Sequence, residues 1–180
     1  MSWKRLDSRT VFENDWMEVR EDHVINPGGG ENQYGYVHFK NRAVAIVPLN
    51  QDQQVWLVGQ QRYTLDAWSW ELPMGGAPLD EPPLDAAKRE LKEETGLDLV
   101  KVNHISLPVF SSAGLTDESC HMVLVEAKGE ASDRWSEDTE DIEVLLLDVE
   151  GIRDLLASKK KIAAKAWGLL YHYAAAGRIG

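Results

Sequence analysis

The stretch GGAPLDEPPLDAAKRELKEETGL, from Gly75 to Leu97, carries the signals of a loop followed by one helix. Pro83 suits the first helical turn, because the N–H group that proline lacks would be unpaired there anyway. Gly96 suits the left-handed position that commonly follows a helix. Between them, apolar residues recur at spacings of three and four and give one apolar face. These residues are Leu84, Ala87 and Leu91. The sequence therefore predicts a helix from about Pro83 to Thr95.

Three glutamates, Glu90, Glu93 and Glu94, stand within five residues near the end of this helix. At 3.6 residues per turn they fall within an arc of about 100°. Like charges at the i and i+4 positions, such as Glu90 and Glu94, destabilise a helix by a few tenths of a kcal/mol. Anions in the last turn also oppose the helix dipole. The cluster is either a solvated acidic face or a ligand set for a divalent cation, and carboxylate oxygens favour Mg²⁺ or Mn²⁺.

The composition indicates a globular protein without affinity for nucleic acid. The chain has 180 residues, with 43% hydrophobic and 27% charged residues, which suits one domain with a real core. Its 19 Lys and Arg residues against 30 Asp and Glu residues give a formal net charge of −11. Nucleic-acid binding relies on Lys and Arg at the phosphates, so we expect no such partner. A small anionic substrate would need bound cations to offset its repulsion from this negative charge.

The sequence gives no sign of membrane association or of a disulfide framework. No run of about 18 apolar residues occurs, and the N-terminal MSWKRLDSRT lacks the apolar centre of a secretory signal. The single cysteine, Cys120, excludes an internal disulfide and suits a small residue packed in a strand. We therefore expect a cytoplasmic protein with no membrane partner.

Strand-like segments flank the predicted helix on both sides, and two further helices close the chain. The predicted strands lie in residues 10–25 (two strands around a turn), 34–39, 43–49, 54–63, 68–73, 102–110, 120–127 and 142–148. The predicted closing helices span residues 149–158 and 162–175. The order of strands, helix, strands and helices predicts a mixed α/β layer architecture. We divide the chain into an N-terminal strand region, residues 1–40, and a main domain, residues 41–180.

The opening stretch fits the pattern G-x5-E-x7-R-E-U-x-E-E-x-G-U, where U is aliphatic, at nine fixed positions over 23 residues. Those positions hold Gly75, Glu81, Arg89, Glu90, Leu91, Glu93, Glu94, Gly96 and Leu97. The sequence therefore resembles the Nudix hydrolases. The resemblance implies an α/β/α sandwich with a mixed sheet, here with an added N-terminal antiparallel strand region. It also implies hydrolysis of a diphosphate with Mg²⁺ or Mn²⁺ as cofactor.

The resemblance assigns roles to the residues of the loop and helix. Glu90 and Glu94 match the principal metal ligands, and Glu93 matches a further ligand or a group that tunes them. The backbone carbonyl of Met74 matches another ligand. Further matches are structural: a buried Arg89–Glu81 ion pair that fixes the loop to the helix, and the first motif glycine, Gly75.

Two segments before the motif, VGQQRY and WELPMG, resemble the ADP-ribose and nucleoside-diphosphate-sugar pyrophosphatases, and this likeness covers about 150 residues. It implies that Arg62 contacts a substrate phosphate, that Glu71 lies near the metal and that Glu118 touches substrate. The subgroup usually carries Ser-Pro-Gly in the later loop, where this chain has Ala113 in SSAGLTDE. Sugar nucleotides other than ADP-ribose, such as GDP-mannose, therefore stay open.

The acidic segment SEDTEDIEV corresponds to a loop that supplies a catalytic base or a further metal ligand in this subgroup. Glu140 is the first candidate, with Glu137 and Asp138 behind it. Trp68 and Trp70 share one strand face. They either pack in the core or stack on the base or sugar of the substrate.

The expected activity is hydrolysis of a nucleoside diphosphate sugar to a nucleoside monophosphate and a sugar phosphate. The alternatives are a house-cleaning nucleotide or dinucleoside polyphosphate hydrolase, and a non-catalytic Nudix domain that senses a ligand. By resemblance to the subgroup we also expect a homodimer.

Overall fold

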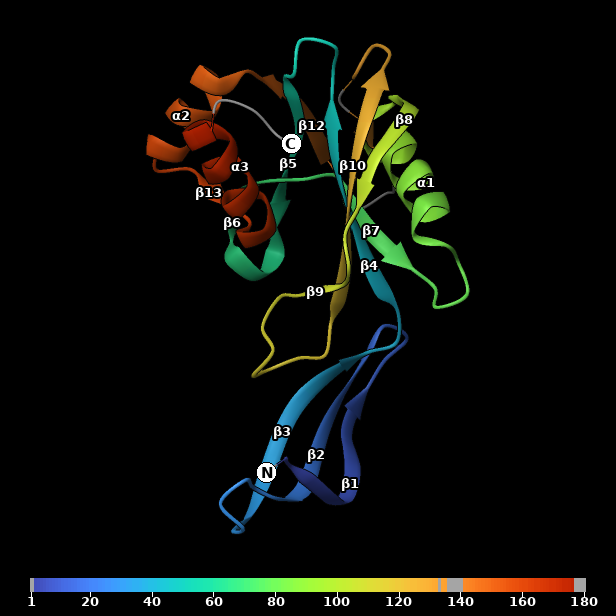
Figure 1. Cartoon of the computed structure of the whole chain (residues 1–180), viewed down its shortest axis with the longest axis vertical. Coiled ribbons are helices and arrows are strands. Elements are labelled where there is room, and N and C mark those ends of the chain that lie inside the picture. Colours follow the sequence, from blue (N-terminus) through green and yellow to red (C-terminus); the bar gives the residue numbers. More distant parts are fainter. Residues whose placement is uncertain (1, 133, 136–140, 177–180) are drawn as a thin grey trace.

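The N-terminal region forms an antiparallel sheet of its own in the computed structural model, which describes residues 2–132, 134–135 and 141–176. Its strands are β1 (Lys4–Glu13), β2 (Met17–Ile25) and β3 (Glu31–Phe39). Strand β2 pairs with both neighbours, and the sheet extends away from the rest of the molecule (Figure 1). The pairing of β1 with β2 confirms the predicted two strands around a turn at residues 14–15. In that turn, Asn14 Oδ1 accepts hydrogen bonds from the backbone N–H groups of Trp16 and Met17.

The main sheet is mixed, as predicted. Its strands are β4 (Arg42–Leu49), β5 (Val55–Arg62), β6 (Ala67–Glu71), β7 (Met74–Ala77), β8 (Asp98–Ile105), β9 (Val109–Phe110), β10 (Ser119–Lys128), β11 (Arg134–Trp135), β12 (Asp141–Leu147) and β13 (Lys161–Ile162). The spatial order is β11-β12-β5-β4-β10-β8, with β6, β7, β9 and β13 paired beside this path. Strand β10 runs parallel to β4 and antiparallel to β8.

Three helices cover the two faces of this sheet: α1 (Pro83–Thr95), α2 (Val149–Ala157) and α3 (Ala164–Ala176). Alternate residues of β4 point to opposite faces. Ile46 packs with Leu91 of α1, whereas Val47 and Leu49 belong to the cluster that contains Leu170 of α3. Helix α1 therefore lies on one side and α2 with α3 on the other, which confirms the α/β/α sandwich (Figure 1).

Helix α1 has the predicted bounds, with Pro83 in its first turn and Gly96 left-handed at φ 76° after its end. The sequence did not predict β7, which pairs with β4 immediately before the loop that leads to α1. This pairing fixes the backbone of Met74 and Gly75 to the central sheet. No helix in the described residues has both the length and the apolar character needed to cross a membrane.

The loop of residues 111–118 joins the main sheet to the N-terminal sheet. Asp117 holds this junction, since its Oδ1 accepts the N–H of Phe39 at 3.0 Å and its Oδ2 lies 2.5 Å from Nδ1 of His38. The N–H of Val37 also donates to the carbonyl of Leu115 at 2.9 Å. Glu118, the next residue along the chain, is thus tied indirectly to β3.

Gly59 of β5 makes room for the two tryptophans of β6. Trp68 and Trp70 meet edge to face, with ring centroids 6.2 Å apart. A Cβ atom at Gly59 would lie 2.6 Å from Nε1 of Trp68 and 2.8 Å from Cζ3 of Trp70. Trp70 is buried in the core cluster under α2 and α3. The glycine is therefore required because the two indoles cross the neighbouring strand.

We predict that Gly59→Ala lowers the free energy of unfolding by about 1–3 kcal/mol, the usual cost of an overpacked core. Urea denaturation measures this loss. Gly35→Ala is the matched strand control, because its new Cβ would meet nothing closer than the carbonyl oxygen of Arg20 at 4.0 Å. Equal stability of the two variants would contradict the packing account.

Candidate active site

Arg89 of α1 gathers four groups around one guanidinium. Its Nη2 donates to the carbonyl of Gly76 at 3.0 Å and to Oε2 of Glu81 at 3.1 Å. Its Nη1 donates to Oε1 of Glu90 at 2.6 Å and to Oε2 of Glu93 at 3.3 Å. Hydrogen bonding to Glu81, and then to Glu90, raises the pKa of Arg89 above its ordinary value. The arginine thereby ties β7 and the loop to the helix and offsets the repulsion within the acidic cluster.

The Arg89–Glu81 pair forms in the structure but is less buried than the family resemblance implies. The exposed fraction is 38% for the Arg89 side chain and 24% for that of Glu81. Solvent screening therefore weakens this pair relative to a fully buried one. The hold on the loop comes from the whole set of contacts, including the uncharged one to the Gly76 carbonyl.

Glu90 lies directly against the backbone of Gly75. A Cβ atom at Gly75 would overlap the Glu90 carboxylate, whereas a Cβ atom at Gly76 would meet no atom within 4 Å. The first glycine of the pair is therefore required by the carboxylate that packs on it. The second is not required on steric grounds.

Glu94 is the most buried of the three carboxylates, with 6% of the residue exposed. Its Oε2 accepts the backbone N–H of Met74 at 3.0 Å, which brings the end of α1 against β7. The Glu93 side chain is 52% exposed. Glu90 and Glu94 thus face the β7 backbone, with Glu93 at the rim.

The carboxylates fit a hard divalent cation in chemistry. Within the described residues, no three His, Cys, Asp or Glu side chains converge tightly enough to form a ready ligand set. Glu90 is held by Arg89, and Glu94 by the Met74 N–H group. The missing side chain at Gly75 leaves the oxygens of Glu90 close to bare backbone, an arrangement that suits carboxylate and carbonyl oxygen ligands.

Arg62, predicted to contact a substrate phosphate, and Glu71, predicted to lie near the metal, are bound to each other. Nε of Arg62 donates to Oε1 of Glu71 at 2.8 Å, and Nη2 donates to Oε2 at 2.7 Å. This two-pronged geometry is specific to a guanidinium. The Glu71 side chain is only 6% exposed, while that of Arg62 is 36% exposed. The pair holds the arginine at the end of β5.

A cavity of about 460 Å³ lies beside Glu71, between β7, β9 and the start of α3. Its walls include Glu71, Met74, Ser111 and Lys165. Lys165 forms an ion pair with Glu118 at 3.3 Å. Sequence reasoning missed Lys165. Its one local signal is a cation in the first turn of a helix, where the dipole disfavours positive charge.

Trp68 and Trp70 line a different cavity of about 450 Å³, together with Glu143 and the three lysines of residues 159–161. The structure therefore does not bring these tryptophans to the cavity beside Met74. Cys120 is buried, and burial raises the pKa of its thiol, which suits the predicted packing role. Three predicted base candidates, Glu137, Asp138 and Glu140, lie outside the described residues.

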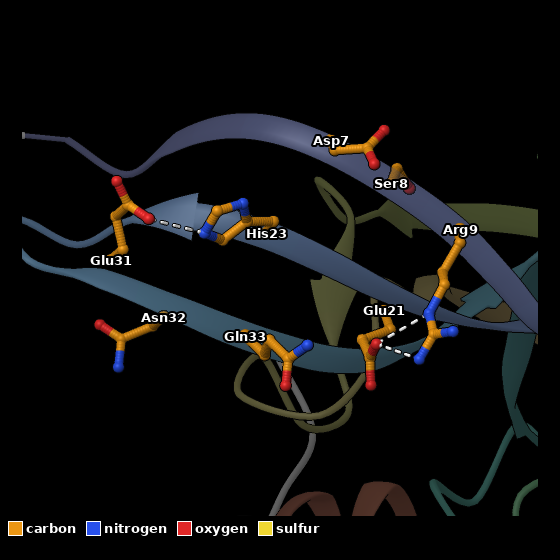
Figure 2. A pocket seen from close by; sticks show the side chains of 8 residues that line it. All are labelled: Asp7, Ser8, Arg9, Glu21, His23, Glu31, Asn32 and Gln33. Atoms are coloured by element: carbon orange, nitrogen blue, oxygen red, sulfur yellow. Dashed lines mark hydrogen bonds and ion pairs between the residues drawn. The ribbon is translucent and has the colours of Figure 1, made fainter.

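A larger hollow lies on the outer face of the N-terminal sheet, where Figure 2 shows its polar lining. Two ion pairs cross it: Arg9 with Glu21, and His23 with Glu31 at 3.0 Å. None of the predicted catalytic or metal-binding residues that the structure describes lines this hollow. Four of its eight lining side chains pair with one another, as on a solvated sheet face.

Comparison with known families identifies the family of this chain. Residues 39–167 match the model of the NUDIX domain. The chain belongs to the Nudix hydrolase family. Residues 3–37 match a second model, that of the nucleoside diphosphate sugar hydrolase N-terminal domain. The carboxylates of α1 lie within the residues that match the NUDIX domain.

Individual relatives agree with this assignment. A CMP-5'-(N-acetyl-N-hydroxy-3-aminopropyl)phosphonate hydrolase of Streptomyces rubellomurinus is 29% identical, covering 94% of this chain and 82% of the relative. An ADP-ribose pyrophosphatase of Bacillus subtilis is 26% identical, covering 93% and 91%. The crystal structure of an ADP compounds hydrolase superposes with a TM-score of 0.79 at 19% identity, covering 99% of this chain and 98% of that one. This last likeness shows the fold.

We predict that Arg89→Ala lowers the free energy of unfolding by about 2 kcal/mol, between the values for exposed and buried ion pairs. The variant loses the tie to the loop and leaves three glutamates without their shared cation. Chemical denaturation measures the loss. The control is Arg153→Ala, which removes an exposed pair with Glu150 within α2 and should cost much less. A loss no larger than that of the control would contradict the role of Arg89.

Proposed function

We propose that this Nudix hydrolase splits the diphosphate bond of a nucleoside diphosphate sugar into a nucleoside monophosphate and a sugar phosphate. The observation that carries the proposal is the match of residues 3–37 to the nucleoside diphosphate sugar hydrolase N-terminal domain. The relatedness to an ADP-ribose pyrophosphatase over nearly the whole chain supports it. The cavity beside Met74, whose N–H binds Glu94, adds space for part of such a substrate.

Mg²⁺ or Mn²⁺ is the proposed cofactor, held by Glu90, Glu93, Glu94 and the Met74 carbonyl. When bound, such a cation neutralises diphosphate charge, polarises the P–O bond and lowers the pKa of a coordinated water. The chain's own part is to keep the carboxylates in place. Arg89 restrains Glu90 and Glu93 from one side, and the Met74 N–H restrains Glu94 from the other.

Substrate contacts are proposed for Arg62 and Glu118. Glu71 holds the guanidinium of Arg62 in one plane through two hydrogen bonds, and a planar guanidinium suits a phosphate. Stacking of a base or sugar on Trp68 or Trp70 stays a proposal, and their cavity lies apart from the one beside Met74.

The proposed general base is Glu140, with Glu137, Asp138 and Glu93 as alternatives, and Glu93 is the most exposed of the three clustered glutamates of α1. Such a base would accept a proton from the attacking water, a contribution of about 10²–10⁴-fold in rate. The proposal rests on the family resemblance of that acidic segment.

Further parts of the proposal concern the whole protein. The two separate sheets support a division into residues 1–40 and residues 41–180. A homodimer is proposed from the family resemblance, and the N-terminal region has exposed apolar side chains that could enter such a contact, among them Trp3, Phe12 and Trp16. A cytoplasmic location rests on the single cysteine of the sequence.

A turnover screen with Mg²⁺ tests the function. We predict hydrolysis of at least one of ADP-ribose, GDP-mannose, ADP-glucose and UDP-glucose, with a sugar phosphate among the products. Glu94→Gln removes an anionic ligand while keeping the shape, so turnover should fall at least about 100-fold. The control Glu150→Gln alters an exposed glutamate of α2 and should leave the rate unchanged.

Three results would count against this account. Wild-type activity in Glu94→Gln would remove the assignment of Glu94. Turnover of dinucleoside polyphosphates or of nucleoside triphosphates, with none of the four sugar nucleotides hydrolysed, would contradict the substrate class. No turnover of any of them would favour a ligand sensor.

A further inference from the structure

We infer that Lys165, on the first turn of α3, binds a phosphate of the substrate in the cavity between β7, β9 and α3. The inference rests on the proposed function and adds a cation that the Nudix motif does not contain. It also makes the C-terminal helix a wall of the substrate site, although this helix lies on the opposite side of the sheet from α1 (Figure 1).

Met74 borders both the cavity of Lys165 and the acidic cluster of α1. Both residues line the same space of about 460 Å³, and Glu71 lies on its wall as well. The backbone N–H of Met74 donates to Glu94. A diphosphate that reaches the carboxylates of α1 past Met74 would thus enter the volume that Lys165 faces.

The contacts of Lys165 suit a cation that is held ready for an anion. Its side chain is 17% exposed, and its partner Glu118 is 22% exposed. Among the described residues, Glu118 has the only carboxylate within 4.0 Å of the ammonium, at the long distance of 3.3 Å. Strong charge-assisted bonds are about 2.7–2.9 Å. The same Glu118 oxygen also accepts the hydroxyl of Ser111, so Lys165 shares its one acidic partner.

The position of Lys165 on its helix works against helix stability. Helices α1 and α2 carry Asp85 and Glu150 in their first turns, as the helix dipole favours, whereas α3 has no acidic residue there. Ala163, Ala164 and Lys165 all line the cavity, so the positive end of α3 borders the same space. A lysine and a helix start together provide positive potential for a phosphate.

The negative charge around the cavity favours a further positive group such as Lys165. The chain carries a formal net charge of −11, and Glu71 and Glu118 both stand at or beside the cavity. The Arg62 guanidinium is engaged by Glu71 on two donors. A diphosphate is itself strongly anionic, so a further positive group is needed on the side of the cavity away from the metal ligands. Lys165 supplies that group.

The test combines kinetics with calorimetry. Kinetics use whichever sugar nucleotide of the four the wild type hydrolyses fastest, and calorimetry uses the matching nucleoside diphosphate (ADP, GDP or UDP) with Mg²⁺. Lys165→Met should raise KM and the Kd of the nucleoside diphosphate about 10- to 100-fold, the range for a hydrogen bond between charged groups. The kcat should change by less than about threefold, since binding in the ground state and in the transition state is lost alike.

Matched variants separate charge from shape and position. Lys165→Arg keeps the charge, so KM and Kd should stay within about threefold of wild type. Lys101→Met removes one positive charge from an exposed ion pair with Glu126, also at 3.3 Å, outside every proposed part of the site, and should behave as wild type. An effect of Lys101→Met equal to that of Lys165→Met would reduce the result to overall charge and overturn the inference.

A double-mutant cycle with Glu118 excludes a purely structural role. Lys165→Met leaves Glu118 without its cation, whereas the double variant with Glu118→Gln carries an uncharged pair that should fold even if the single variant does not. If Lys165 binds phosphate, the double variant stays about 10- to 100-fold weaker than Glu118→Gln alone. If the two have equal KM and Kd, Lys165 only neutralises Glu118 and the inference is wrong.

The outcome distinguishes this inference from the proposed function. A wild type that hydrolyses none of the four sugar nucleotides and binds none of the three diphosphates contradicts the proposed function, and the inference falls with it. A wild type that is active, with Lys165→Met unchanged in KM and Kd, overturns the inference alone.

Discussion

The guanidinium of Arg89 is the interaction on which the site depends. It binds the Gly76 carbonyl, Glu81, Glu90 and Glu93 at once, so one side chain joins β7, the following loop and the acidic face of α1. Without it, the negative charges in the last turns of α1 would repel one another against an unfavourable dipole. An arginine suits this position because its planar donors bind several oxygens in fixed directions, which a lysine cannot do.

The central sheet fixes the backbone against which Glu90 and Glu94 pack. Strand β7 is paired with β4, whose side chains are buried on both faces, so the backbone at Met74 and Gly75 is fixed by the core. Glu94 binds the Met74 N–H, and Glu90 occupies the place of a side chain at Gly75. The rigid sheet thus positions the flexible ends of two glutamates, and it also forms one wall of the cavity that reaches Lys165 on the other side.

Local features of the sequence predicted α1, because proline, glycine and the apolar spacing act within a few residues. The Nudix pattern likewise predicted the Arg89–Glu81 pair, eight residues apart. Contacts between distant segments carried no such signal: Lys165 meets Glu118 across 47 residues, and His38 meets Asp117 across 79. For Trp68 and Trp70 the sequence left core packing and stacking open, because strand alternation gives a shared face but does not say which cavity that face borders. Gly59, opposite them, was the overlooked sign of close packing.

The central claim is that the Glu90 carboxylate, packed on bare backbone at Gly75, forms part of a divalent metal site. Calorimetric titration of Mn²⁺ into Gly75→Ala and Gly76→Ala tests it most directly, because the two variants add the same methyl group one residue apart. A Cβ atom at Gly75 would overlap Glu90, and one at Gly76 would meet nothing within 4 Å. The account predicts that Gly75→Ala weakens Mn²⁺ binding at least about tenfold while Gly76→Ala binds like the wild type. Equal Mn²⁺ affinity in both variants, with both folded, would contradict it.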